Sequence, residues 1–142
     1  MQTGLKQVAA LPIRRNKGRK PDVMLVTSRE TGRWVIPKGW PSKKIKDNAA
    51  AAREARQEAG VTGKISKKPI GYYRYKKRTN NLQKLVYVNV FLLEVKKEKK
   101  VWLEKKFRHR RWFDNQSASR KVREPKLKDL LSNLHRSKDI LK

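Results

Sequence analysis

Residues 39–61, GWPSKKIKDNAAAAREARQEAGV, constrain the fold and the function more than any other stretch of the chain. Glu54 and Glu58 are four residues apart and Gln57 is three beyond Glu54, so their side chains share one face of a helix. Two carboxylates at this spacing repel each other. A divalent cation such as magnesium would turn the repulsion into coordination, because hard cations take oxygen ligands.

The same stretch predicts a helix over residues 49–59, where no β-branched residue occurs. Asp47 or Asn48 is the expected N-cap, and Gly60 is the expected left-handed C-cap. The four consecutive alanines that begin at Ala49 predict close packing of one helix face against a sheet.

Charge distinguishes this chain of 142 residues more than its apolar content, which is 37% and falls in blocks that predict one packed domain over residues 1–142. Lys and Arg number 39 against 12 Asp and Glu, for a net charge of +27. Such a charge attracts polyanions, including nucleic acid and polyphosphates. Compositional drift, with most lysines on solvated faces, is an equally weighted origin of this charge.

Several classes of site are excluded by composition. The chain has no cysteine, which rules out disulfides and thiolate sites, and its two histidines, His109 and His135, are isolated. No apolar run approaches the length of a membrane span, and the first residues lack the plan of a signal peptide. We therefore expect a cytoplasmic protein without a membrane partner; its oligomeric state stays open.

The order of predicted elements is strands, helix, strands, helix, which indicates an α/β domain with a mixed β-sheet between helices. Residues 62–77 predict a strand pair or one long strand with Gly71 as a bulge, and residues 82–95 predict the central strand. A charged loop is expected over residues 96–100. Asp114 is expected to cap a helical stretch, and Pro125 to open an amphipathic helix. The other predicted strands cover residues 5–15, 22–28, 33–36 and 110–113.

The stretch that begins at Gly39 resembles the Nudix box, G-x5-E-x7-R-E-U-x-E-E-x-G-U, in which U is a bulky apolar residue. The flanking RWVIPKGWP is similar to the branch of diphosphoinositol polyphosphate and diadenosine polyphosphate hydrolases, and the likeness extends over residues 5–134. It implies a Nudix-like α/β/α sandwich. The residues that match the box are Gly39, Arg53, Glu54, Glu58, Gly60 and Val61.

The resemblance also implies a metal site for Mg²⁺ or Mn²⁺. Its ligands would be the side chains of Glu54, Gln57 and Glu58 with the Gly39 carbonyl; Glu54 or Glu58 would be the catalytic base, and Arg53 would orient the glutamates. Two positions depart from the box, which has glutamate where this chain has Ile45 and Gln57. Gln57 keeps a carbonyl oxygen but removes one negative charge, which predicts weaker metal binding and reduced activity.

The implied activity is hydrolysis of a pyrophosphate bond in a phosphorylated small molecule, a nucleoside or inositol polyphosphate. Arg14, Arg33 and Lys38 are candidate phosphate contacts, each with a solvated-surface interpretation of equal weight. Glu104 is a candidate outer ligand or base, and a solvated acid is its simpler interpretation. Removal of pyrophosphate from RNA 5′ ends through the basic surface is one alternative function. A catalytically weak or inactive domain that binds RNA or polyphosphate is another.

Overall fold

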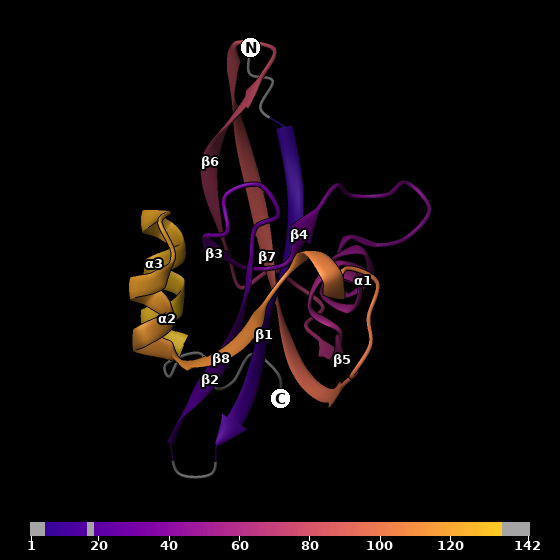
Figure 1. The fold of residues 1–142 in the computed structure, drawn as a ribbon, viewed down its shortest axis with the longest axis vertical. Coiled ribbons are helices and arrows are strands. Elements are labelled where there is room, and N and C mark those ends of the chain that lie inside the picture. Colours follow the sequence, from indigo (N-terminus) through magenta and orange to yellow (C-terminus); the bar gives the residue numbers. More distant parts are fainter. Residues whose placement is uncertain (1–4, 17–18, 135–142) are drawn as a thin grey trace.

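The fold is built around β7 (Leu82–Glu98), the longest strand of an eight-stranded mixed sheet (Figure 1). β1 (Leu5–Asn16) runs parallel to β7, whereas β5 (Val61–Ile65) and β6 (Gly71–Thr79) pair with it in the antiparallel sense. The computed structural model describes residues 5–16 and 19–134, so the remainder of the predicted 1–142 domain, with His135, lies outside the described residues. The prediction of a central strand here is confirmed.

The other half of the sheet is built on β1 and β2. β2 (Arg19–Thr27) is antiparallel to β1 and carries β3 (Trp34–Val35) and β8 (Arg110–Asp114) as further partners. β4 (Lys38–Gly39) pairs with β1 at Val8 and Ala9. The β2–β3 hairpin therefore delivers the chain to Lys38 and Gly39, as the sequence predicts.

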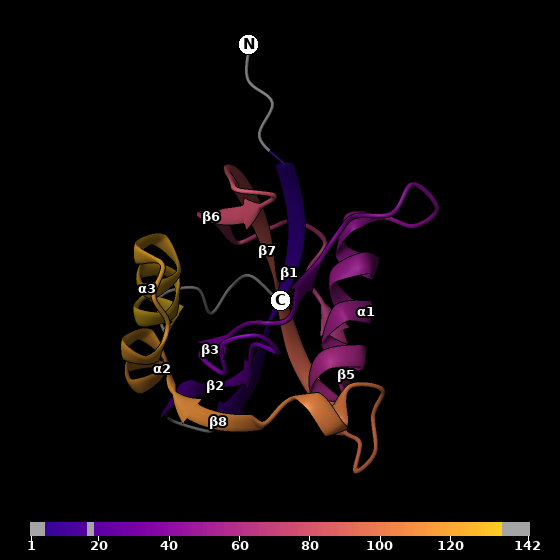
Figure 2. The same cartoon turned by 45° about the horizontal axis from the view of Figure 1, so that its top comes forward.

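Helices cover both faces of the sheet. α1 (Asp47–Ala59) lies on one side, and α2 (Asn115–Lys121) and α3 (Pro125–Ser132) lie on the other (Figure 2). Each face has its own buried core: one packs α1 against Val8, Met24 and Leu93, and the other packs Leu127 and Leu131 against β1, β2 and β7. The α/β/α sandwich is confirmed.

The alanines of α1 allow the helix to sit directly on the sheet. Ala50, Ala51, Ala55 and Ala59 are completely buried, and Gly60 ends the helix at φ 70° as predicted. The predicted N-cap was wrong, because the cap is Lys46, whose carbonyl accepts a hydrogen bond from Ala50 N. Asp47 and Asn48 instead form the first turn of α1.

The prediction for residues 62–77 also needs correction. β5 and β6 do not pair with each other; they pair with different parts of β7, because β7 is long enough to serve both in turn. Gly71 begins β6 and forms no bulge, and a Cβ there would crowd Leu130 of α3. The loop expected over residues 96–100 is shorter, because β7 continues to Glu98.

Local signals at the C-terminal side of the chain are confirmed. Asp114 caps α2 by accepting a hydrogen bond from Ser117 N at 2.8 Å, which also lowers the pKa of its carboxyl. Pro125 opens α3, whose leucines lie in or against the core. Asn80 and Asn81 form the β6–β7 turn at φ 49° and 65°.

Two glycines in the described part of the chain, Gly32 and Gly60, have a left-handed backbone conformation, and comparing them tests the packing at the end of α1. A Cβ at Gly32 (φ 72°) would meet nothing within 4 Å, whereas at Gly60 it would lie 2.7 Å from atoms of Trp102 and Arg110. We expect Gly32→Ala to lower the free energy of unfolding by about 1 kcal/mol, through backbone strain alone. Gly60→Ala should cost clearly more. Urea unfolding measures both, and equal losses would contradict the close packing at Gly60.

Candidate active site

Two carboxylates on the C-terminal half of α1 lie together where the helix meets β4. Glu58 is 6% exposed, shares a hydrogen bond with Glu54, and accepts one from Lys38 N at 3.3 Å. A Cβ at Gly39 would overlap the Glu54 carboxyl group, so a larger residue at this position would displace that carboxyl group. The structure therefore brings Gly39, Glu54 and Glu58 together, as the sequence predicts.

Burial makes the charged state of this pair costly. It raises the pKa of Glu58 to about 8, against the opposing effect of Arg108, and the neighbouring carboxylates of Glu54 and Glu104 raise it further. The pKa of Glu54 is also raised, chiefly by burial, while Arg53 acts in the opposite sense. The Arg53 charge therefore favours the ionised form of Glu54, and the orienting role expected for Arg53 stays a prediction.

Arg108 connects the helix to the loop that carries Glu104. Its guanidinium donates to Glu104 Oε1 at 2.7 Å and to the Thr27 carbonyl at 3.0 Å, and its Nη2 lies 3.6 Å from Glu58 Oε2. Trp102 holds the same loop against α1 by donating its indole N–H to the Glu58 carbonyl at 3.0 Å. Glu104 is therefore connected to Glu58 through Arg108, and it is not the solvated acid of the simpler interpretation.

The oxygen atoms expected as ligands at this site are of the kind that bind a divalent cation. A buried carboxyl group beside a half-buried one is a pair that a cation stabilises, and the Gly39 carbonyl and the Gln57 amide are the further oxygens expected from the sequence. Across residues 5–16 and 19–134, no three His, Cys, Asp or Glu side chains are grouped as a ready metal cluster. The third acid, Glu104, is engaged by Arg108.

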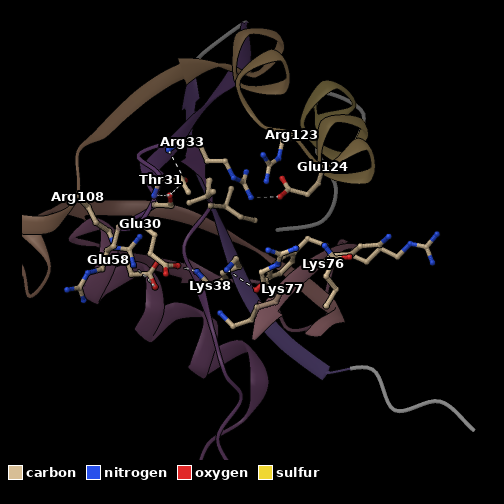
Figure 3. Close-up of a pocket in the computed structure, with 18 of the residues that line it drawn as sticks. Glu30, Thr31, Arg33, Lys38, Glu58, Lys76, Lys77, Arg108, Arg123 and Glu124 are labelled. Carbon is tan, nitrogen blue, oxygen red and sulfur yellow. Dashed lines mark hydrogen bonds and ion pairs between the residues drawn. The ribbon is translucent and has the colours of Figure 1, made fainter. Parts of the chain in front are cut away.

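A cavity of about 1200 Å³ opens beside Glu58 (Figure 3). Nine basic and three acidic residues line it, so it is strongly cationic. Arg33 and Lys38 are among them, as predicted for phosphate contacts. The basic lining residues are Arg29, Arg33, Lys38, Arg74, Lys76, Lys77, Arg78, Arg108 and Arg123; the acidic ones are Glu30, Glu58 and Glu124.

Lys38 lies between Glu58 and Tyr75, which both line this cavity. Its ammonium group donates to the Tyr75 hydroxyl at 3.2 Å, and that hydroxyl donates to Gln7 Oε1 at 2.7 Å. Burial lowers the pKa of Lys38, while the Glu58 carboxylate acts to raise it. An anion entering the cavity would add negative charge beside an ammonium group that is held in place.

The structure does not bring Arg14 to this cavity. Arg14 pairs with Asp22 at 2.8 Å and lies over the Trp112 ring, 4.4 Å from its centroid. Ile45 and Trp40 are exposed on the loop before α1, and neither lines the cavity. Gln57 is half-buried, and its backbone carbonyl accepts a hydrogen bond from Glu104 N at 3.0 Å.

Sequence reasoning missed Arg108, Tyr75 and Glu124. Of the three tyrosines near Arg74, Tyr73 is buried in the core and Tyr75 lines the cavity. Glu124 directly precedes Pro125, and the sequence pattern at this point indicated only the start of a helix. The four-residue spacing of Glu104 and Arg108 was available, but it lies outside any predicted helix, where that spacing carries no meaning.

Comparison with known proteins agrees with this geometry. Residues 5–134 match the sequence model of the NUDIX domain. The chain belongs to the Nudix family. Its relatives include Nudix hydrolase 13, mitochondrial, of Arabidopsis thaliana, which is 30% identical over 105 residues, or 70% of this chain and 52% of that protein. The chain spans about half the length of the curated relatives it matches.

Solved structures share this Nudix fold. The C. elegans Ap4A hydrolase superposes with a TM-score of 0.67 at 17% identity, covering 95% of this chain and 98% of that one. The NUDIX domain of Shewanella oneidensis NrtR, complexed with ADP ribose, gives 0.59 at 12% identity, covering 100% and 91%. Within the described residues of this Nudix domain, no helix has the length and apolar content needed to cross a membrane. The cytoplasmic location stays a prediction.

The buried carboxylate predicts how the stability of the metal-free protein depends on pH. Because the pKa of Glu58 is raised on folding, its favourable contribution is complete below about pH 4.5 and is lost as pH rises through about 8. We expect Glu58→Gln to remove at least about 1 kcal/mol of the fall in unfolding free energy between pH 5 and pH 8. Urea unfolding with EDTA at several pH values measures this difference.

Glu30→Gln is the matched control, because Glu30 is an exposed acid that lines the same cavity. It should leave the pH dependence of wild-type unfolding nearly unchanged. A parallel pair of pH profiles for wild type and Glu58→Gln would contradict the burial cost assigned to Glu58.

Proposed function

We propose that this Nudix domain is a metal-dependent hydrolase that cleaves a pyrophosphate bond in a nucleoside or inositol polyphosphate. The observation that carries the proposal is the buried Glu58, paired with the half-buried Glu54, at the edge of a cavity lined by nine basic residues. A polyphosphate complements the cavity, and a cation complements the carboxylates. The relatives named as Nudix hydrolases and the fold shared with an Ap4A hydrolase support this choice.

The metal would be held by the carboxylates of Glu54 and Glu58, the Gly39 carbonyl and the Gln57 side chain. A divalent cation, Mg²⁺ or Mn²⁺, supplies charge neutralisation at phosphate oxygens and a bound water that is more acidic than bulk water. Because glutamine replaces a carboxylate at position 57, this site carries one negative charge fewer than a complete box. We therefore expect a higher metal concentration to be needed to occupy the site.

The protein side chains divide between binding phosphate and moving a proton. Lys38 lines the cavity and presents positive charge to phosphate oxygens, and Arg33, paired with Glu124, lies in the same cavity wall. Glu58 is the first candidate to take the proton from the attacking water, because its carboxyl group lines the cavity beside the expected position of the metal and its bound water. Arg108 keeps Glu104 and Glu58 in a defined arrangement.

An RNA 5′ end is a second candidate substrate. The β6–β7 hairpin extends the cavity wall with Arg74, Lys76, Lys77 and Arg78, so the basic surface continues beyond the carboxylate pair. A chain of nucleotides would follow such a surface, and its binding would fall steeply with salt. Small polyphosphates and triphosphorylated RNA therefore belong in the same substrate panel.

Phosphate release from this panel, measured with Mg²⁺ and with Mn²⁺, tests the proposal. We expect Glu58→Gln to lower turnover at least about a hundredfold, since it removes both a ligand and the first candidate base. Gln57→Glu should raise turnover and lower the metal concentration needed for half-maximal rate, because it restores the missing charge.

Glu30→Gln serves again as the control for the loss of one acid from the cavity. Absence of turnover on every substrate, unchanged in Gln57→Glu, would contradict the enzyme proposal. That result would favour the domain that binds RNA or polyphosphate without cleaving it.

A further inference from the structure

Arg33 and Glu124 form an ion pair in the cavity wall away from the carboxylates of α1 (Figure 3). Arg33 Nη2 donates to Glu124 Oε2 at 2.8 Å, and the two side chains are 26% and 9% exposed. The pair uses only half of its hydrogen-bonding groups. Among the described residues, Arg33 Nη1 and Glu124 Oε1 are buried and have no partner.

An unused donor beside an unused acceptor is costly inside a protein. Each buried polar atom without a partner costs about 1–3 kcal/mol, and most such atoms in folded proteins are satisfied. A second contact between the same two groups would have removed the cost, but the pair has a single one. A group that completes the arrangement would have to offer an acceptor to Arg33 Nη1 and a donor to Glu124 Oε1.

The pair belongs to the same cavity as the proposed catalytic groups. Both Arg33 and Glu124 act electrostatically on Lys38, whose backbone N–H binds Glu58. A ligand with its phosphates near Lys38 would therefore have its other end available to Arg33 and Glu124. A cavity of about 1200 Å³ has room for a ligand of nucleotide size or larger.

The chemistry of the pair separates two classes of ligand. A phosphate group near neutral pH offers acceptors only, and its charge would lie beside the Glu124 carboxylate, which repels it. The edge of a nucleobase offers an acceptor next to a donor and carries no charge. An inositol ring bearing a phosphate on every carbon offers nothing equivalent.

We propose that Arg33 and Glu124 form a subsite for a neutral group that presents an acceptor beside a donor, such as a nucleobase edge, and that disfavours phosphate. This inference rests on the proposed function for the phosphate end of the ligand. It selects nucleoside polyphosphates over fully phosphorylated inositols. Glu124 is then a specificity residue, in addition to joining α3 to the strand side of the cavity.

Binding without turnover tests the subsite. Calorimetric titration in EDTA compares β,γ-methylene ATP, which has a nucleoside, with inorganic tripolyphosphate and with inositol hexakisphosphate, which have none. We expect wild type to bind the nucleotide at least about tenfold more tightly than tripolyphosphate, the value of one well-made hydrogen-bonded contact. Glu124→Gln should bind tripolyphosphate more tightly and the nucleotide more weakly, so that the preference falls toward one.

Glu30→Gln is the matched control, since it removes a negative charge from the same cavity away from the Arg33–Glu124 pair. It should change the affinities for the nucleotide and for tripolyphosphate in the same proportion. Equal affinities in wild type, or a proportional change in Glu124→Gln, would overturn the subsite. The wild-type comparison decides the matter even if Glu124→Gln folds poorly.

The design separates this inference from the proposed function. Selective nucleotide binding by a protein that hydrolyses nothing with Mg²⁺ or Mn²⁺ would leave the subsite standing and overturn the hydrolase. Turnover without any preference for ligands that carry a nucleoside would support the hydrolase and overturn the subsite.

Discussion

The cost of holding negative charge on the Glu54–Glu58 pair is the constraint on which the rest of the site depends, because burial raises the pKa of both carboxyl groups. Both groups are on α1, and Glu58 is buried where it accepts a hydrogen bond from Lys38 N of β4. Glycine at position 39 lets the backbone approach Glu54 closely, and Arg108 offsets part of the charge on Glu58. The metal-free protein keeps this pair at a cost in stability that a bound cation would remove.

The fold places this costly pair by rigid packing. Four buried alanines seat α1 on the sheet, and Gly60 ends the helix against Trp102 and Arg110. Arg110 continues the connection by donating to the carbonyls of Ala59 and Lys99 at 2.8 Å each. The loop that carries Glu104 is therefore held against the C-terminal end of α1, so the third acid lies near the other two without help from its own secondary structure.

The sequence predicted the parts of this site that depend on local spacing. The shared face of Glu54 and Glu58, the Gly60 cap and the strand–helix order follow from periodicities of a single chain segment. It did not predict Arg108, Tyr75 or Glu124, because their contacts with Glu58, Lys38 and Arg33 join residues that are 37 or more positions apart. Arg14 illustrates the converse: a basic residue near a predicted strand end pairs with Asp22 instead.

The central claim is that Glu54 and Glu58 hold a divalent cation despite glutamine at position 57. Anomalous X-ray diffraction from crystals of the protein soaked in Mn²⁺ tests it most directly, because the signal locates the metal independently of activity. The account predicts a peak bounded by the carboxylates of Glu54 and Glu58 and the carbonyl of Gly39. A Mn²⁺ peak elsewhere in the protein, with Glu54 and Glu58 still sharing their hydrogen bond, would contradict it.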